Sequence, residues 1–237
     1  MSADRMNMTE FADLARALGA ADGQTDRLVL AVEAAVELIP GCLHAGITIN
    51  RNGTCHTLAS TGDLLPAVNA LQNDLGEGPC HDADREAEVV VVADLVADQR
   101  WSTWGKRLHG DFGIGSVVSI MVFTARGTYG TLSLYAARRN AFDADDLATA
   151  QALAGHLAVA LAAGREIEGM VAALQSRTVI GQAEGILMER LGVDSAQALA
   201  YLKRVSSHTN TKLVRLAEQI VTTRQLPDTA DREPADG

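Results

Sequence analysis

The sequence predicts an α+β fold: a sheet with mostly antiparallel pairing and helices against one face, then a long helix and a small helical module. Two observations support this class. Runs of strand character occur in pairs joined by tight turns, and such connections are too short for the crossovers that parallel strands need. Helical periodicity fills the stretches between and after these pairs. Helices packed on an antiparallel sheet form an α+β domain.

Five short apolar runs have the composition of strands. They occupy residues 42–50, 53–61, 88–95, 114–124 and 127–137. The first two runs meet at Asn52-Gly53, a strong short-range hairpin signal, and a second hairpin is predicted at 125–128. The sheet is therefore expected to contain two hairpins and one further strand.

Helical segments precede, separate and follow these runs. The first stretch, up to the stop at Pro40-Gly41, predicts one or two helices divided near Gly19 to Gly23. Helical or loop segments are expected at 63–76 and 101–110. From Phe142 to about Leu191 no proline interrupts the pattern, which predicts one very long helix.

Apolar and small residues recur along the long helix in alternating steps of four and three. They are Leu153, Leu157, Ala160, Gly164, Ile167, Val171, Leu174, Thr178 and Gly181. This heptad seam predicts a coiled coil with a second chain, because a helix of this length cannot pack entirely on a domain of this size. The alternative is a helix that breaks near Gly164 and folds back on its own chain.

The C-terminal stretch predicts a compact three-helix unit. Asp194 and Gln197 form a capping-box pattern at the start of a helix, and Asn210 or Thr209 is expected to cap the next one. Pro227 ends that helix, and residues 227–237 have the composition of a disordered acidic tail.

Two glycines interrupt the end of the long helix. Gly181 and Gly185 lie one turn apart, although an interior glycine costs a helix about 1 kcal/mol relative to alanine. We expect them to admit a close backbone neighbour. Packing of another helix is the commoner cause, and an RNA backbone is the alternative.

Composition and charge narrow the class of protein. The 237 residues carry a net charge of −10, yet residues 170–226 hold seven Lys and Arg against four Asp and Glu, so a mildly basic module ends an acidic body. No run reaches the roughly 18 uninterrupted apolar residues of a membrane span, and the first residues lack a signal-peptide pattern. A cytoplasmic protein without a membrane segment is expected.

Neither the cysteines nor any known catalytic motif indicates a metal site or an enzymatic activity. Cys42, Cys55 and Cys80 are odd in number and lack CxxC spacing, which argues against a disulfide framework and a zinc site, so buried free thiols are expected. Cys80-His81 invites a metal, haem or redox assignment, but we expect a buried thiol beside a surface imidazole. Because hydrolase, metalloprotease and phosphate-loop motifs are missing, we do not expect an enzyme.

The segment SRTVIGQAEGILMERLGVDSAQALAYLKRVSSHTNTKLVRLAEQIV resembles an ANTAR domain, the RNA-binding module of bacterial transcription antiterminators. The positions that match the family's spacing are Arg177, 180–188, Ala198, Leu202, Asn210, Lys212-Leu213, Ala217 and Ile220-Val221. Upstream, LGEGPC (75–80), VADLVADQRW, GIGSVVSIMVF and YGTLSLYAARRNAFDADD resemble the GAF domains that precede ANTAR in actinobacterial proteins.

These resemblances imply a domain order. They imply an N-terminal helical extension (1–24) and a GAF-like sensor domain (25–165). A coiled-coil helix end with an ANTAR domain (166–226) and an acidic tail (227–237) follow. The expected architecture is thus a GAF-like antiparallel sheet with helices, a long coiled-coil helix and a three-helix ANTAR module.

The family resemblance also implies an activity and a partner. ANTAR proteins bind tandem stem-loops in leader transcripts, and two stem-loops require two modules. The resemblance therefore implies a homodimer, here formed through the 150–190 helix. It also implies that the GAF domain gates RNA binding, with a small molecule as its possible ligand. The GAF ligand, any cofactor and the target transcripts are not identified. The residues expected to contact RNA are polar or cationic: Arg177, Gln182, Arg190, Lys203, Arg204, Ser206, Asn210, Lys212 and Arg215.

The sequence departs from the ANTAR pattern at one position, and two other functions are alternatives to RNA binding. Glu184 stands where many ANTAR sequences have lysine, which removes a potential phosphate contact. The three short helices could instead form a helix-turn-helix that binds DNA, although its recognition helix would be weakly charged. The chain could also be a small-molecule or redox sensor that acts through protein contacts alone.

Overall fold

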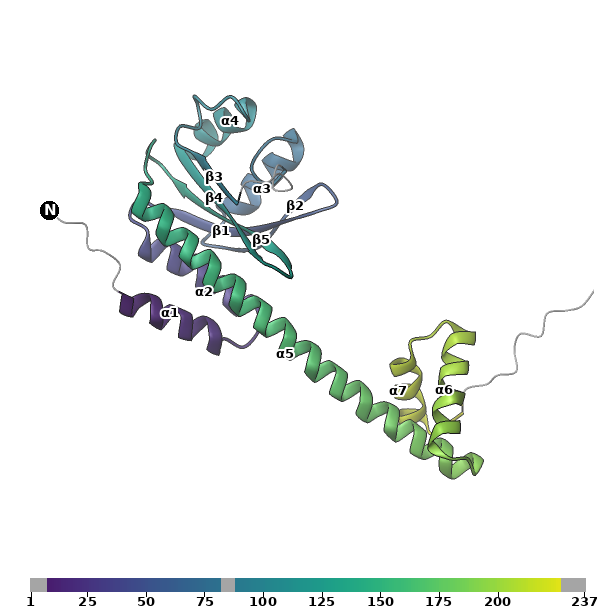
Figure 1. Cartoon of the computed structure of the whole chain (residues 1–237). Helices are drawn as coiled ribbons and strands as arrows, with labels where there is room; N and C mark the ends of the chain where they lie inside the picture. The colour runs from purple at the N-terminus through teal and green to yellow at the C-terminus, as the bar shows by residue number, and fades with distance from the viewer. Residues whose placement is uncertain (1–7, 82–87, 227–237) are drawn as a thin grey trace, which may run out of the picture. The chain divides into compact units, whose positions relative to one another are not determined.

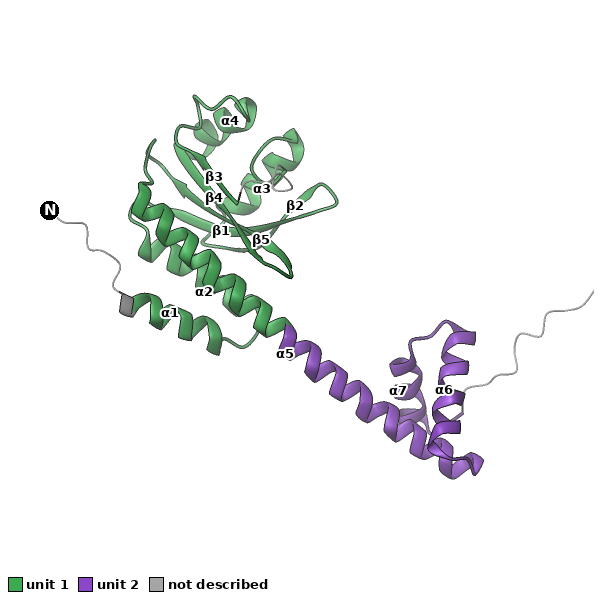
Figure 2. Cartoon of the chain, in the orientation of Figure 1, with its two compact units in different colours: residues 1–165 green, residues 166–237 purple. Residues whose placement is uncertain are grey.

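The computed structural model describes residues 8–81 and 88–226. The chain divides into two compact units, residues 1–165 and residues 166–237 (Figure 2). The predicted acidic tail, 227–237, lies outside the described residues. Each unit has its own hydrophobic core, and the two are described separately below.

Unit 1 is built around a five-stranded antiparallel sheet with strand order β2-β1-β5-β4-β3 (Figure 1). The strands are β1 (His44–Arg51), β2 (Thr54–Ser60), β3 (Val89–Val92), β4 (Ser116–Thr124) and β5 (Gly127–Ala136). All five predicted strands and both hairpins are confirmed. At the first hairpin Asn52 and Gly53 have φ angles of 54° and 83°, the left-handed pair that a two-residue turn of this type requires.

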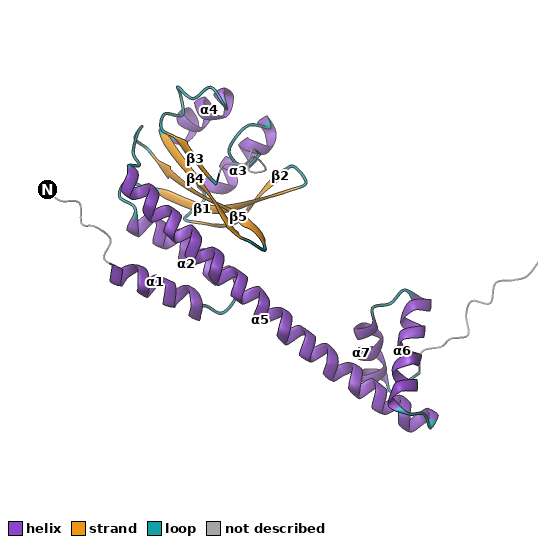
Figure 3. Cartoon of the chain, in the orientation of Figure 1, coloured by secondary structure: helices purple, strands orange, loops and turns teal. Residues whose placement is uncertain are grey.

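Helices cover both faces of this sheet, so the expectation of helices against one face was wrong (Figure 3). The helices of unit 1 are α1 (Met8–Ala20), α2 (Gln24–Leu38), α3 (Leu64–Leu75), α4 (Ser102–Phe112) and the first part of α5 (Ala144–Leu191). Val118 and Leu134 pack with α2 and α5, whereas their neighbours Val117 and Tyr135 pack with α3 and α4. Adjacent strand residues point to opposite faces, and here both are apolar, which is why each face carries a helical layer.

The long helix α5 is continuous from Ala144 to Leu191, which confirms the prediction of one long helix and excludes a break near Gly164. Asp143 caps its first turn by accepting hydrogen bonds from the backbone N–H groups of Asp145 and Asp146, at 2.9 and 3.0 Å. Among the described residues, α5 alone is long and apolar enough to cross a membrane by length and composition. A core helix passes the same test, and α5 contributes Leu153 and other buried residues to the core of unit 1.

The predicted heptad seam divides into two parts in the structure. Leu153, Leu157 and Gly164 are buried within unit 1, where Gly164 lies against the guanidinium of Arg27. These residues cannot also face a second chain. The part of the seam that a second chain can contact is therefore shorter than the sequence pattern suggests. The exposed apolar side chains of α5 include Ile167, with 60% of its surface accessible. The others are Val159, Met170, Val171, Leu174, Met188 and Leu191.

Unit 2 consists of the end of α5 with α6 (Ser195–Thr209) and α7 (Leu213–Thr223), packed around a small core that includes Ala183, Leu187, Leu202 and Ile220. The capping box is confirmed: Asp194 accepts from the N–H of Gln197 at 2.8 Å, and the side chain of Gln197 accepts from the N–H of Asp194 at 3.1 Å.

The prediction that Asn210 or Thr209 caps the third helix was wrong. Asn210 instead ends α6, with φ 51° and its N–H bonded to the carbonyl of Ser206, and the residue before α7 is Lys212, which makes no side-chain cap bond. Asparagine tolerates the left-handed conformation that terminates many helices, so the same residue suits either role and only the chain path decides between them.

Candidate nucleic-acid interface

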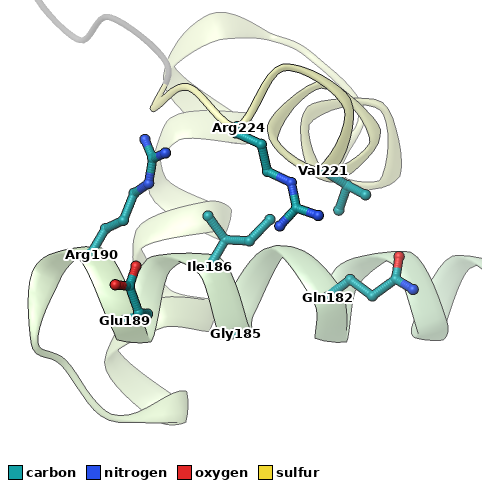
Figure 4. A pocket seen from close by; sticks show the side chains of 7 residues that line it. All are labelled: Gln182, Gly185, Ile186, Glu189, Arg190, Val221 and Arg224. Carbon is teal, nitrogen blue, oxygen red and sulfur yellow. The ribbon is translucent and has the colours of Figure 1, made fainter.

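A groove of about 570 Å³ opens on unit 2 between the end of α5 and the end of α7 (Figure 4). Its lining residues are Gln182, Gly185, Ile186, Glu189, Arg190, Val221 and Arg224. Four of them, at 182, 185, 186 and 189, recur at the spacing of one helix face. The groove therefore follows a stripe of α5, with α7 as its second wall.

Two guanidinium groups carry positive charge into this groove. Arg190 rises from α5, and Arg224 extends from the end of α7 toward α5, while Glu189 places one carboxylate beside Arg190 (Figure 4). Arg224 is the C-cap of α7 in a left-handed conformation, φ 55°, and its N–H bonds to the carbonyl of Ile220 at 2.9 Å. A guanidinium fork matches the geometry of a phosphate group.

The two interior glycines face open space rather than another helix of this chain. A Cβ placed on Gly181 or on Gly185 would meet no atom of the described residues within 4 Å. Gly105 in α4 is different, since its Cβ would come within 2.3 Å of the carbonyl oxygen of Leu95. The expectation that another helix of the chain packs against Gly181 and Gly185 was therefore wrong for the described residues, and Gly155 and Gly169 of α5 face open space in the same way.

The structure brings two of the nine predicted RNA-contacting residues together. Gln182 and Arg190 share the groove, whereas Arg177 is exposed on α5 outside the groove lining, and Lys203 and Arg204 are exposed on α6. The guanidinium of Arg204 lies 5.5 Å from the ring of Tyr201, a contact that holds the side chain against its own helix.

The remaining predicted residues cluster around the turn between α6 and α7. Ser206 donates a hydrogen bond from its hydroxyl to the carbonyl of Thr211 at 2.6 Å, so it shapes the turn. Lys212 is exposed at the start of α7, and Arg215 forms an exposed ion pair with Glu218 at 3.2 Å. Asn210 ends α6, as described above. Ser206 and Asn210 thus have local structural roles that are independent of any ligand.

Glu184 has a structural partner. Its carboxylate accepts a hydrogen bond from the hydroxyl of Ser195 at 3.2 Å, which links α5 to the first residue of α6. The Glu184 carboxylate is half-buried and lies outside the groove lining. It therefore contributes to the packing of unit 2.

In unit 1 the segment 75–80, LGEGPC, begins at the last residue of α3 and makes contacts with α4. Gly76 ends α3 with φ 62°, and the next residue, Glu77, accepts hydrogen bonds from the N–H groups of Thr103 and Trp104 at 3.0 and 2.9 Å. These are orphan donors in the first turn of α4, so Glu77 caps a helix that lies 26 residues later in the chain. The hydrogen bond from Trp104 is the main reason that the pKa of Glu77 is lowered.

The last residue of that segment, Cys80, forms a disulfide with Cys55 of β2, with the two Cα atoms 6.1 Å apart. The expectation that all three cysteines are free thiols was therefore wrong for this pair. Twenty-five residues separate the two positions, and the return of the chain through α3 brings them together. Cys42 is free and buried, and burial raises the pKa of its thiol to about 11.

A hydrogen-bond network of amide side chains surrounds the Cys55–Cys80 pair. Asn73 of α3 accepts from the N–H of Cys55 at 2.8 Å and donates to its carbonyl at 3.1 Å. Gln72 accepts from the N–H of Cys80 at 3.0 Å, and Asn50 donates to the carbonyl of Cys80 at 3.1 Å. Both backbone segments of the pair are thus held by side chains from β1 and α3.

Two buried nitrogens near this region have no hydrogen-bond partner within the described residues: Nε2 of His81 and Nε1 of Trp104. Within the same residues, no three His, Cys, Asp or Glu side chains are placed to hold a metal ion. Cys80 is therefore one half of a disulfide, and His81 beside it has a buried nitrogen without a partner among the described residues. Within those residues the two side chains belong to no group that could hold a metal ion.

Sequence reasoning identified part of this site and missed the rest. Gly185 was identified because an interior helical glycine is unusual. Val221 was named only as a position that matches the family, and Arg224, the C-cap of α7, was missed. The only available signal for Arg224 was a cation close to Pro227, where the helix had to end. Glu77 lay inside a matched motif without an assigned role.

Comparison with protein-family models finds two matches. Residues 24–162 match the GAF domain model and residues 168–221 match the ANTAR domain model. No curated protein sequence matches the chain.

Solved structures resemble unit 1 in fold. The GAF domain of a phosphoenolpyruvate-protein phosphotransferase from Coxiella burnetii is 20% identical, with a TM-score of 0.54 over 70% of this chain and 99% of that one. A free methionine-R-sulfoxide reductase from Neisseria meningitidis, solved with its substrate, is 17% identical, with a TM-score of 0.56 over 70% of this chain and 95% of that one.

At these identities the structures support the fold of unit 1 alone, whereas the family models cover most of the chain. Their order along the sequence, a sensor-type domain followed by an RNA-binding-type domain, is typical of regulatory proteins that are not enzymes. The chain belongs to the GAF-ANTAR proteins.

Proposed function

We propose that this protein is a cytoplasmic, non-enzymatic transcription antitermination regulator that binds stem-loop RNA through unit 2, with the GAF domain as its gate. The observation that carries the proposal is the match of 168–221 to the ANTAR domain, together with a groove there that holds two arginines. An RNA reader needs cations for phosphates and polar side chains for bases. We assign the sensor to 25–165 and the RNA-binding module to 166–226, between the extension 1–24 and the tail 227–237.

Binding of tandem stem-loops requires two modules, which we propose are joined in a homodimer through α5. Four apolar side chains support this proposal because they lie within two turns and are exposed to between 47% and 67% of their surface: Ile167, Met170, Val171 and Leu174. Ile167, Val171 and Leu174 follow coiled-coil steps of four and three. The proposed interface begins after Gly164, where the helix leaves the core of unit 1.

The experiment is a salt titration of binding between the purified chain and a tandem stem-loop RNA, with a single stem-loop and a duplex DNA as controls. The proposal expects preferential binding to the tandem RNA, with affinity that falls as salt rises. Arg177→Ala and Lys212→Ala are expected to weaken RNA binding while the dimer persists. Equal affinity for all three nucleic acids, in the full chain and in residues 141–237 alone, would contradict the proposal, and preference for the duplex would favour the DNA-binding alternative.

The Cys55–Cys80 pair favours a redox signal as the input of the GAF domain. A peroxide can supply the oxidation: the thiol of one cysteine is converted to a sulfenic acid with release of water, and the second thiol displaces another water to form the disulfide. Reduction by a small dithiol reverses the reaction by two exchanges, which return both thiols and leave the reductant as its own disulfide.

This redox input is tested by RNA affinity under peroxide and under a dithiol, in the wild type and in Cys80→Ser. A redox gate expects two affinities in the wild type and one in the variant. Cys42→Ser is the matched control, because Cys42 is buried and free and lies outside the pair. If the wild type shows a single affinity in both conditions, the pair has only a structural role.

A further inference from the structure

We infer that α1 is a strap over the start of the dimer seam, that Arg27 of α2 holds it there, and that its release extends the seam upstream of Ile167. The extension runs through Gly164 to Ala160. This inference rests on the proposed homodimer and adds to it a device that sets the length of the interface. The strap lies outside the GAF match, which begins at residue 24.

Arg27 is a buried cation whose partners belong to the end of α1. It has 8% of its surface exposed, and it donates hydrogen bonds to the carbonyls of Leu18 at 3.1 Å and Ala21 at 2.9 Å. Within the described residues these two carbonyls are its hydrogen-bond partners. The last carbonyls of a helix lack intrahelical donors and form the negative end of its dipole, so Arg27 stabilises the end of α1 from a neighbouring helix.

The same guanidinium covers one position of α5. A Cβ built on Gly164 would come within 2.4 Å of the Nη1 atom of Arg27, so glycine is required where the side chain crosses the helix. Gly155 and Gly169 of α5 face open space instead. Gly164 is therefore the glycine of these three that admits a neighbour, and the neighbour is the side chain that holds α1.

Apolar and aromatic contacts complete the seat of α1. Leu18 is fully buried in the core of unit 1, and Ala160 of α5 packs against the same core. The ring of Phe11 lies 5.9 Å from the ring of His156, one helical turn before Ala160. α1 therefore lies alongside the stretch 156–164 of α5 (Figure 1).

The covered positions belong to the heptad seam. Ala160 precedes Ile167 by seven residues and Gly164 precedes Val171 by seven, so each pair occupies the same position of the repeat. Ile167 and Val171 are exposed to 60% and 47% of their surface, whereas Ala160 is half-buried and Gly164 is buried. The seam thus continues upstream in the sequence, and α1 with Arg27 takes the place of a second chain there.

Release of α1 uncovers this part of the seam. Arg27 then loses both carbonyl acceptors, and because a buried guanidinium without partners is unfavourable, its side chain turns toward water and leaves Gly164. The helix α5 stays on unit 1, since Leu153 packs in the core and the guanidinium of Arg165 lies 4.4 Å from the centre of the Tyr129 ring. The α5 of a second chain can then pack on the uncovered stripe, so the strap and the second chain compete for it.

The first experiment measures which seam positions two chains share. Ala160→Cys is expected to form an intermolecular disulfide slowly, and roughly tenfold faster when combined with Arg27→Met, in proportion to the population in which α1 is released. Arg27→Met keeps the length of the side chain and removes both hydrogen bonds. Leu174→Cys is the control, because it lies on the exposed seam and is expected to cross-link at one rate with and without Arg27→Met. Mass spectrometry of the linked peptides identifies each bond.

The second experiment tests the hold on α1 by hydrogen exchange. Arg27→Met and Gly164→Ala are each expected to speed backbone exchange in residues 8–20, because the first removes the hydrogen bonds and the second displaces the guanidinium. Gly169→Ala is the matched control, since it adds the same methyl group to α5 in open space, and it is expected to leave the exchange of α1 unchanged.

The outcomes separate this inference from the homodimer on which it rests. If Leu174→Cys links no two chains and the wild type is a monomer at every concentration, the homodimer fails. If Leu174→Cys links them and Ala160→Cys reacts at one rate with and without Arg27→Met, α1 does not control the seam. If neither Arg27→Met nor Gly164→Ala speeds exchange in α1, Arg27 does not hold the strap.

Discussion

The dimer seam on α5 gives a quantitative prediction. Leu174 has 67% of its surface exposed and lies one heptad after Ile167, which is 60% exposed. Leu174→Glu places a carboxylate at this position on both chains of the proposed dimer, where like charges would face each other in an apolar interface. We expect the variant to be monomeric at concentrations at which the wild type is a dimer.

The size of the effect follows from the exposure of Leu174. Full burial of a leucine side chain is worth about 1.5 to 3 kcal/mol, so burial of the two thirds that is exposed is worth about 1 to 2 kcal/mol per chain. Two chains lose about 2 to 4 kcal/mol, which weakens the dimer by about 30-fold to almost 1000-fold, before any charge repulsion is added.

Sedimentation velocity over a range of concentrations measures this dissociation constant. Ala173→Glu is the control, because it adds the same charge on an exposed position one residue away that does not belong to the seam. The reasoning is refuted if both glutamate variants retain the wild-type constant, or if the wild type is a monomer at every concentration. Far-UV circular dichroism of each variant checks that α5 remains helical.

Three further predictions concern unit 1. Glu77→Ala is expected to lower the free energy of unfolding by about 1 kcal/mol, the usual worth of a helix cap. Because the pKa of Glu77 is lowered in the folded state, its contribution exists above the ordinary value of 4.5 and is lost as the pH falls through the folded value, so the difference between wild type and variant should shrink in acid; a difference independent of pH contradicts the role of the charge. Reduction of Cys55–Cys80, or Cys80→Ser, is expected to cost about 3 kcal/mol in denaturant unfolding, since the bond closes a loop of 25 residues, and equal midpoints with and without a dithiol would argue against that bond. Gly105→Ala is expected to destabilise the domain by about 1 to 2 kcal/mol, because its Cβ would come within 2.3 Å of the carbonyl oxygen of Leu95, and a higher Tm would refute this contact.

Local patterns in the sequence were sufficient to predict most elements of the fold. The hairpin at Asn52-Gly53 follows from two residues that accept positive φ, and the capping box of Asp194 and Gln197 closes within four residues. The continuous α5 follows from the absence of proline over its length. These features are determined by neighbours in the chain, so the sequence alone predicts them.

Features that depend on distant parts of the chain were missed or assigned wrongly. The heptad pattern could not distinguish Leu153, which packs in the core of its own unit, from Leu174, which is exposed, because the two lie three heptads apart and so occupy equivalent positions in the repeat. The pattern also could not pair Cys55 with Cys80, since spacing along the chain does not report distance in space. Asn210 has a side chain that suits both ends of a helix, and the chain path selected the C-cap of α6.

The site shows the same division. From the sequence alone came the interior glycines, the basic C-terminal stretch, and Gln182 and Arg190 as two of the groove residues. Only the tertiary structure placed Arg224 against α5, showed that the glycines face open space, and gave Glu77 a helix to cap. The physical reason is the range of the interactions involved: periodicity, caps and turns act over a few residues, whereas a groove or a disulfide forms only after segments far apart in the chain have packed together.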